Sequence, residues 1–290
     1  MISASTVIQS VLSGVLEGGN YALYSVGLAF VFGIMQIINM SHGEFLVLGG
    51  YLSYWLLILW GVNPLLALPA SALAAGGAAY LSYRIFIERI RTTPELNTLI
   101  LTFGIGIFFS NLYLQLWTAD LRNIGVPWME NPIHLGGIYF SLGEGVTFVI
   151  SFLGIYGLHF FLTRSRTGKA VRVTALDRDA AALAGINVER IDQLAFFIGG
   201  LLAGLGGPLM GMLSFISPNT GMHITVKAFI LTVLAGVGSI PGLILAGILL
   251  GVGEALTVTF ISSSFRELFG FSLFLFILLT RPTGLFGKKG

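Results

Sequence analysis

The sequence predicts an all-α integral membrane protein, a polytopic bundle of about 8–10 transmembrane helices with broken or re-entrant segments. Hydrophobic residues make up 55% of the 290 residues and charged residues only 10%. The mean hydropathy is +0.90, whereas a soluble domain carries about 25% charged residues. The few charged residues also lie between long uncharged runs, several of which reach the roughly 20 residues that a helix needs to cross a bilayer.

The uncharged runs indicate eight spans and two shorter apolar segments. The run 45–83 is nearly twice the length of a span, and the turn at Gly61-Val62-Asn63-Pro64 divides it. The shorter segments, 6–17 and 227–240, each end in glycine-rich sequence and could mark the broken helices found in transporters. Ten segments cross if both short ones do, and eight if both are re-entrant; the sequence leaves this open. The expected spans are 18–38, 42–60, 64–83, 95–117, 144–163, 192–216, 241–261 and 266–280.

Lysine and arginine are distributed unevenly, and this predicts the orientation. Cytoplasmic loops carry an excess of these residues. With the C-terminus in the cytoplasm, an alternating topology leaves only Arg122, Lys227 and Arg266 of the 15 basic residues outside. The chain 1–290 then forms one transmembrane domain with a cytoplasmic loop over 164–191. The basic residues expected inside are Arg84, Arg89, Arg91, Arg164, Arg166, Lys169, Arg172, Arg178, Arg190, Arg281, Lys288 and Lys289.

Several function classes lack the residues that they require. Cysteine is absent, and the net charge of +2 is too small to indicate a nucleic-acid partner. The phosphate-binding pattern GxxxxGK[ST] does not occur, and His42 stands in no zinc-binding spacing. We therefore expect no metal or cofactor in this chain. The sequence contains no assembled catalytic group that would indicate an intramembrane enzyme. Energy for pumping must therefore come from another chain or from an ion gradient.

The loop 164–191 contains a predicted short helix. Asp177 to Leu183 is alanine-rich with an acidic first turn, which favours a helix, and Gly185 follows where a helix typically ends. The helix is either a solvated connector or a docking element whose small side chains fit a partner's groove.

Glycine spacing and the longest outer loop give two further expectations. Gly14/Gly18, Gly200/Gly204, Gly207/Gly211 and Gly247/Gly251 are spaced as GxxxG, which favours close helix contacts in a membrane. The loop 118–143 carries Trp128, Tyr139 and two prolines after Trp117. This composition is typical of an interfacial aromatic belt, and it also suits a docking surface for an external partner.

Polar residues in or beside the spans are candidates for a translocation path, namely Glu17, Asn20, Tyr21, Asn39, His42 and Glu44. A carboxylate at the depth of Glu17 is costly, so it either lines the path or lies in water at a re-entrant tip. The block 39–44 is expected at the cytoplasmic surface, with Ser41 and Glu44 forming a capping box for the next helix. Glu254 is expected near the outer end of its span, where it could snorkel or cap.

The motifs of this chain resemble those of LivH-type permeases of bacterial ABC importers for branched-chain amino acids. The resemblance runs in order over essentially the whole chain. It rests on 18–23, 32–34 and 38–44, on the central pattern 168–186, on the late pattern 227–256 with Gly238-Ser239-Ile240-Pro241-Gly242, and on the ending 281–287. Three positions depart from the family pattern: Ser41 replaces the usual Ala, Leu176 stands where Glu or Gln is more common, and Glu17 where an apolar residue is common.

The resemblance implies a multi-pass subunit of the bacterial inner membrane, surrounded by lipid. It implies a second, homologous permease, two cytoplasmic ATPases that bind the ATP, and an extracytoplasmic amino-acid-binding protein as partners. The helix after Asp177 would fit into an ATPase groove, with Arg172, Asp177, Ala181, Leu183 and Gly185 as coupling-loop residues. The departure at Leu176 removes one polar contact expected there.

Other functions stay open at this stage. Related permeases import urea or short amides, and the permease motifs do not distinguish these substrates. An ion-coupled secondary transporter, with Glu17 or Glu254 as its proton site, is the alternative from a different class.

Overall fold

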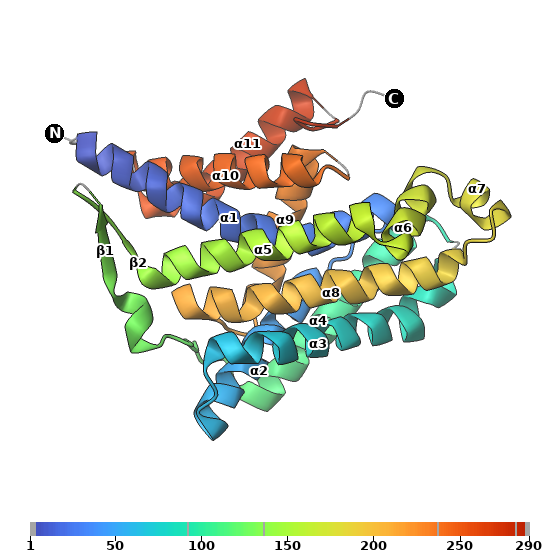
Figure 1. Cartoon of the computed structure of the whole chain (residues 1–290), viewed down its shortest axis with the longest axis horizontal. Coiled ribbons are helices and arrows are strands. Elements are labelled where there is room, and N and C mark those ends of the chain that lie inside the picture. The colour runs from blue at the N-terminus through green and yellow to red at the C-terminus, as the bar shows by residue number, and fades with distance from the viewer. Residues whose placement is uncertain (1–3, 92, 136, 237, 282, 288–290) are drawn as a thin grey trace.

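The computed structural model describes residues 4–91, 93–135, 137–236, 238–281 and 283–287, and it is a bundle of helices (Figure 1). Within these residues, eight helical segments are long and apolar enough to cross a membrane, which confirms the expected polytopic bundle. They are α1 (Ala4–Met35), α2 (His42–Trp60), α3 (Pro64–Ser82) with the π and 3-10 turns that extend it to Ile90, α4 (Glu95–Trp117), α5 (Leu142–Arg164), α8 (Val188–Leu213), α10 (Ile240–Phe260) and α11 (Arg266–Thr280) with the 3-10 turn before it.

The helices differ strongly in how much of their surface the bundle covers. In the apolar stretch of α1, 83% of the residues are buried, and 67% in that of α8, against 11% in the last span. The outer helices present large apolar side chains outward, among them Phe108 of α4, Phe152 of α5 and Phe276 of α11. In a bilayer these side chains meet lipid tails, so their exposure carries no hydrophobic penalty.

Glycine pairs allow the interior helices to approach at backbone distance. Gly14 and Gly18 of α1 face Gly251 and Gly247 of α10. A Cβ atom on Gly247 would lie 2.5 Å from the carbonyl oxygen of Gly18, far inside van der Waals contact, so only glycine fits. The GxxxG prediction is therefore confirmed. Of the other pairs, Gly200 and Gly204 lie against α3, Gly207 against α2 and Gly211 against Ile124.

The first helix is continuous, which corrects the expected short segment at its start. Residues 6–17 are the first part of α1, a single helix of 32 residues. Glu17 interrupts the uncharged run of the sequence without interrupting the helix. There is accordingly no helix break at Asn20 and Tyr21, and no re-entrant tip at Glu17.

The chain is non-helical after α1, where residues 36–41 run back into the bundle. α2 then begins at His42, whose Nε2 lies 2.9 Å from the carbonyl oxygen of Tyr24. Tyr24 lies eleven residues before the end of α1, which is about 16 Å along a helix axis. The polar block 39–44 is therefore inside the bundle and not at its surface, so that expectation was wrong.

The second short segment belongs to α9 (Thr220–Ala235), which is shorter than a span. α9 also begins inside the bundle, because the backbone N of Gly43 in the first turn of α2 donates to Thr225 Oγ1 (2.8 Å). Its other end meets the C-terminal tail, where the N of Leu285 donates to the carbonyl of Leu234 (2.8 Å). Of the two short segments, 6–17 is therefore part of the first span, and α9 is a separate short helix that starts inside the bundle.

The bundle has two distinct ends (Figure 1). The hairpin end carries the start of α1 and an antiparallel hairpin of β1 (Pro132–Leu135) and β2 (Ile138–Ser141), in which Ile133 pairs with Phe140. The α7 end carries α6 (Arg166–Leu176) and α7 (Arg178–Leu183). Neither the hairpin nor α6 was predicted. Lys288 and Lys289 lie outside the described residues.

Candidate functional site

A large cavity of about 1070 Å³ opens into the hairpin end of the bundle. Its lining comes from the first half of α1, the loop before the hairpin, β2, and the ends of α5, α8, α9 and α11 that face this side. The volume is at the upper end of the range usual for small-ligand sites. Apolar and flexible side chains cover much of the wall, namely Leu16, Val126, Met129, Met210, Met212, Leu213 and Ile224.

A charged cluster of five side chains lies at the wall of this cavity: Glu17 and Tyr21 of α1, Lys227 of α9, Glu254 of α10 and Arg266 of α11. Lys227 Nζ lies 3.0 Å from Glu254 Oε1, and Arg266 Nε lies 3.0 Å from Glu254 Oε2. Arg266 also pairs with Glu17 through Nη2. The Tyr21 hydroxyl lies 2.7 Å from Glu17 Oε1 and 2.9 Å from Glu254 Oε2, so its single proton can go to either carboxylate.

The members of the charged cluster differ in their access to the cavity. The side chain of Glu254 is fully buried, whereas Lys227, Arg266 and Glu17 are 23%, 36% and 39% exposed. These three and Tyr21 line the cavity. The expectation that Glu254 snorkels or caps at the end of its span was wrong. Its two cations come from the helices before and after it, α9 and α11, and only their packing brings them to the carboxylate.

Asn20 links this wall to α5. Its Oδ1 accepts from Ser151 Oγ (2.7 Å), and its Nδ2 donates to Thr147 Oγ1 (3.3 Å). Asn20 lines the cavity although almost all of its surface is buried. Of the residues expected on the path, the structure therefore brings Glu17, Asn20 and Tyr21 together at one cavity.

The other expected path residues form a separate buried junction. Asn39 Oδ1 accepts from both the N and the Oγ of Ser41 (3.1 and 2.7 Å), and the Ser41 side chain accepts no hydrogen bond from the first turn of α2. The capping box with Glu44 is therefore absent, and that prediction was wrong. Glu44 is buried beside Gly221 of α9, and its Oε2 finds no hydrogen-bond partner among the described residues. Asn39, His42 and Glu44 are not part of the wall described for the large cavity.

At the opposite end, α7 confirms the predicted helix after Asp177. Asp177 Oδ1 accepts from the N of Asp179 (3.0 Å) and the N of Ala180 (2.9 Å), which caps the first turn. Gly185, at φ +82°, turns the chain toward α8. Ala181 is fully buried against the rest of the chain, whereas Leu183 is 90% exposed. The expectation that small alanine side chains form the outward surface therefore fails at Ala181.

An ion-pair anchor at Asp192 holds α7 on the bundle. Asp192, in the second turn of α8, is fully buried and accepts from Arg178 Nη2 and Arg91 Nη1, each at 2.6 Å. Arg178 also donates to the carbonyl oxygen of Ile34 at the end of α1 (3.2 Å). α7 is thus connected directly to α1 and α8, and through Asp192 to the turn after α3. This anchor was not predicted.

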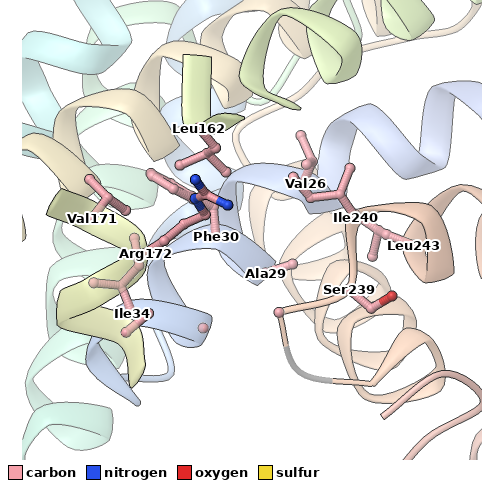
Figure 2. A pocket seen from close by; sticks show the side chains of 13 residues that line it. Val26, Ala29, Phe30, Ile34, Leu162, Val171, Arg172, Ser239, Ile240 and Leu243 are labelled. Atoms are coloured by element: carbon pink, nitrogen blue, oxygen red, sulfur yellow. The ribbon is translucent and has the colours of Figure 1, made fainter. Parts of the chain in front are cut away.

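Arg172 lies away from the tip of α7. It lines a smaller pocket of about 100 Å³ whose other walls are almost entirely apolar, including Phe30, Leu162, Val171 and Leu243 (Figure 2). Arg172 therefore belongs to the junction of α6 with α1 and α10. Among the described residues, no group of three or more His, Asp or Glu side chains could hold a metal ion.

These features define the class of the protein. A continuous bundle of apolar helices encloses a cavity open toward one side, and at the other side an exposed helix is fixed to the bundle by buried ion pairs. This is the arrangement of a transmembrane permease, with a compartment inside the bundle and a contact element outside it.

The comparisons with known proteins then give the family. The family model "Branched-chain amino acid transport system / permease component" matches residues 10–280. The high-affinity branched-chain amino acid transport system permease protein BraD of Pseudomonas aeruginosa is 34% identical, covering 97% of this chain and 96% of its own length. LivH of Escherichia coli K12 is 33% identical with the same coverage. LivM of Escherichia coli K12 is 27% identical over 98% of this chain and 71% of its own length. The chain belongs to this family of permease components and is a transport subunit.

Proposed function

We propose that this chain imports branched-chain amino acids as one permease subunit of an ATP-driven complex in a bacterial inner membrane. The match to the family model across residues 10–280 carries the proposal. Relatives over nearly the whole chain are named as branched-chain amino acid permeases. The similarity to LivM supports pairing with a second, homologous permease. An external binding protein delivers the substrate, and two cytoplasmic ATPases bind and hydrolyse the ATP.

The α7 end is the cytoplasmic, ATPase-facing end in this proposal. The excess of arginine and lysine there supports the orientation. Two exposed leucines offer apolar contacts for a groove on the ATPase. Leu176, at the end of α6, is 87% exposed, and Leu183, at the end of α7, is 90% exposed. The Asp192 anchor would transmit a displacement of α7 to α1 and α8, because these elements share its ion pairs.

Leu183→Asp tests the coupling role. The complete complex is reconstituted in vesicles with ATP on the α7 side and leucine-loaded binding protein on the other. We expect the variant to insert normally but to lose most leucine-stimulated ATP hydrolysis and uptake, since a charge replaces an apolar contact. Val173→Asp is the matched control, because Val173 is 42% exposed in α6, at the same end of the bundle but outside α7. Wild-type coupling in Leu183→Asp would show that α7 is only a connector.

The ion-coupled alternative requires a carboxylate that can take up and release a proton. The candidates are Glu254, which pairs with Lys227 and Arg266, and Glu17, which pairs with Arg266. Leucine uptake that needs ATP and survives collapse of the proton gradient would rule out this alternative. Replacing the binding protein by one specific for urea or an amide tests the other alternative, because substrate choice should follow the binding protein.

A further inference from the structure

We propose that the charged cluster is the site at which the ammonium and carboxylate groups of a zwitterionic amino acid bind inside the permease. This deepens the proposed function and rests on it. The relatives' names give a substrate, but they do not say which side chains hold it. The structural basis is the meeting of two acids, two bases and a tyrosine hydroxyl at the wall of the cavity.

The charges of the cluster suit a zwitterion better than a single ion. Within the cluster Glu17 and Glu254 balance Lys227 and Arg266, so it offers a group of each sign and no net charge. Three further carboxylates, Glu130, Glu144 and Glu267, line the cavity outside the cluster. A zwitterion can open the Glu17–Arg266 pair and replace it by two: its carboxylate pairs with Arg266 and its ammonium with Glu17. No charge is then left unpaired in the membrane.

The exposure of the charged side chains to the cavity supports binding of a zwitterion by the Glu17–Arg266 pair. Glu17 and Arg266, which pair with each other, are the most exposed of the four charged side chains. Glu254 is fully buried and holds both Lys227 and Arg266 from behind. The Glu17–Arg266 pair can therefore open toward the cavity while Glu254 keeps the cations in place. The Lys227 ammonium also lies 4.3 Å from the centre of the Tyr21 ring, which fixes its position further.

The remaining cavity wall suits an aliphatic side chain. Leu16 lies one residue before Glu17, and Met210 and Met212 line the same cavity from α8. Methionine adapts to differently branched partners because it is unbranched and flexible. The wall can therefore accept leucine, isoleucine or valine with little preference, since one methylene contributes only about 1–3 kcal/mol in a hydrophobic pocket. Selection would fall to the binding protein.

The test uses the reconstituted complex and compares Glu17→Gln and Arg266→Gln with wild type. We expect leucine transported per ATP hydrolysed to fall roughly ten- to a hundredfold, the effect of losing one charged hydrogen-bond partner. ATP hydrolysis stimulated by the loaded binding protein should persist, because the α7 end is untouched. Glu267→Gln is the matched control: Glu267 adjoins Arg266 and lines the cavity without belonging to the cluster.

A second measurement separates binding from a purely structural role. The chain has no cysteine, so a Ser13→Cys variant reports access to the cavity by its rate of maleimide labelling. L-leucine should slow this labelling, whereas 4-methylpentanoate and isopentylamine, which each lack one charge, should not. Protection should disappear when Glu17→Gln is added.

Two results would overturn the inference. One is a wild-type ratio of leucine transported to ATP hydrolysed in both variants. The other is a loss of leucine transport that is fully explained by a smaller amount of folded complex. The proposed function fails separately, if the wild-type complex shows no ATP-dependent leucine uptake at all.

Discussion

Asp192 holds Arg91 and Arg178 at once, with Oδ2 at 2.6 Å from a guanidinium nitrogen of each. In sequence the two arginines lie on either side of the outer spans α4 and α5, and this carboxylate joins them. Its burial makes the arrangement dependent on charge, because a fully buried carboxylate is stable only when it is paired. The position of α7 therefore depends on one side chain of α8.

Asp192→Asn should loosen α7. The amide keeps the shape but loses the charge, and both arginines are about one-third exposed, so water recovers part of the loss. We expect a cost of about 1–3 kcal/mol, seen as a lower Tm in detergent and faster proteolysis of 164–191. Asp120→Asn, in an exposed pair with Arg122, is the control and should cost about 0–1 kcal/mol. Equal effects of the two substitutions would count against the anchor.

Gly247→Val should separate α1 from α10. The added Cβ alone would lie 2.5 Å from the carbonyl oxygen of Gly18, and the two methyl groups require still more space. Overpacking of this kind costs about 1–3 kcal/mol. Thermal unfolding in detergent measures it. Gly157→Val in α5 is the control, since among the described residues a Cβ there meets nothing within 4 Å. If both variants unfold at the same temperature, the α1–α10 contact is looser than described.

Ala181→Leu should disturb the fold of the loop, whereas Ala182→Leu should not. Ala181 is fully buried and its neighbour Ala182 is exposed, although both lie in the same short helix. A larger side chain at Ala181 must push α7 away from the bundle, at a cost of about 1–3 kcal/mol. Limited proteolysis of 164–191 should therefore accelerate in Ala181→Leu alone. Equal proteolysis would show that α7 does not pack through Ala181.

Gly284→Val should weaken the contact of the C-terminal tail with α9. Gly284 has φ +79°, and a Cβ there would lie 2.5 Å from the N of Gly236, so strain and crowding act together. Gly61→Val tests the strain alone, because Gly61 has φ +64° and a Cβ there meets nothing within 4 Å of the described structure. Strain at such an angle costs about 1–2 kcal/mol. We expect a larger fall in Tm for Gly284→Val, and a smaller one would contradict the tail contact.

Features that depend on a local pattern could be predicted from the amino-acid sequence alone. Uncharged runs located the spans because each helix must satisfy its own backbone and cover it with apolar side chains. The acidic cap at Asp177 and the glycine at Gly185 bounded α7 because both act within one turn. The GxxxG spacing marked Gly247 and Gly251 as contact positions because i and i+4 share a helix face. The ordered motifs were enough to indicate the family.

Features that depend on contacts between different helices became visible only in the folded structure. Glu17 interrupts an apolar run in the sequence and was predicted to lie near a helix break. The helix in fact continues through it, and its carboxylate pairs with Arg266 of α11. Ala181 was predicted to be exposed on the docking helix. The ion pair between Arg178 and Asp192 holds α7 against the bundle, and Ala181 is buried there. The block 39–44 was predicted to be a turn at the cytoplasmic surface, whereas α2 and α9 both start inside the bundle and meet there. The residue pattern along one helix shows which faces of that helix are apolar or polar. It does not show which charged side chains pair with one another, because the pairs form only when different helices pack together.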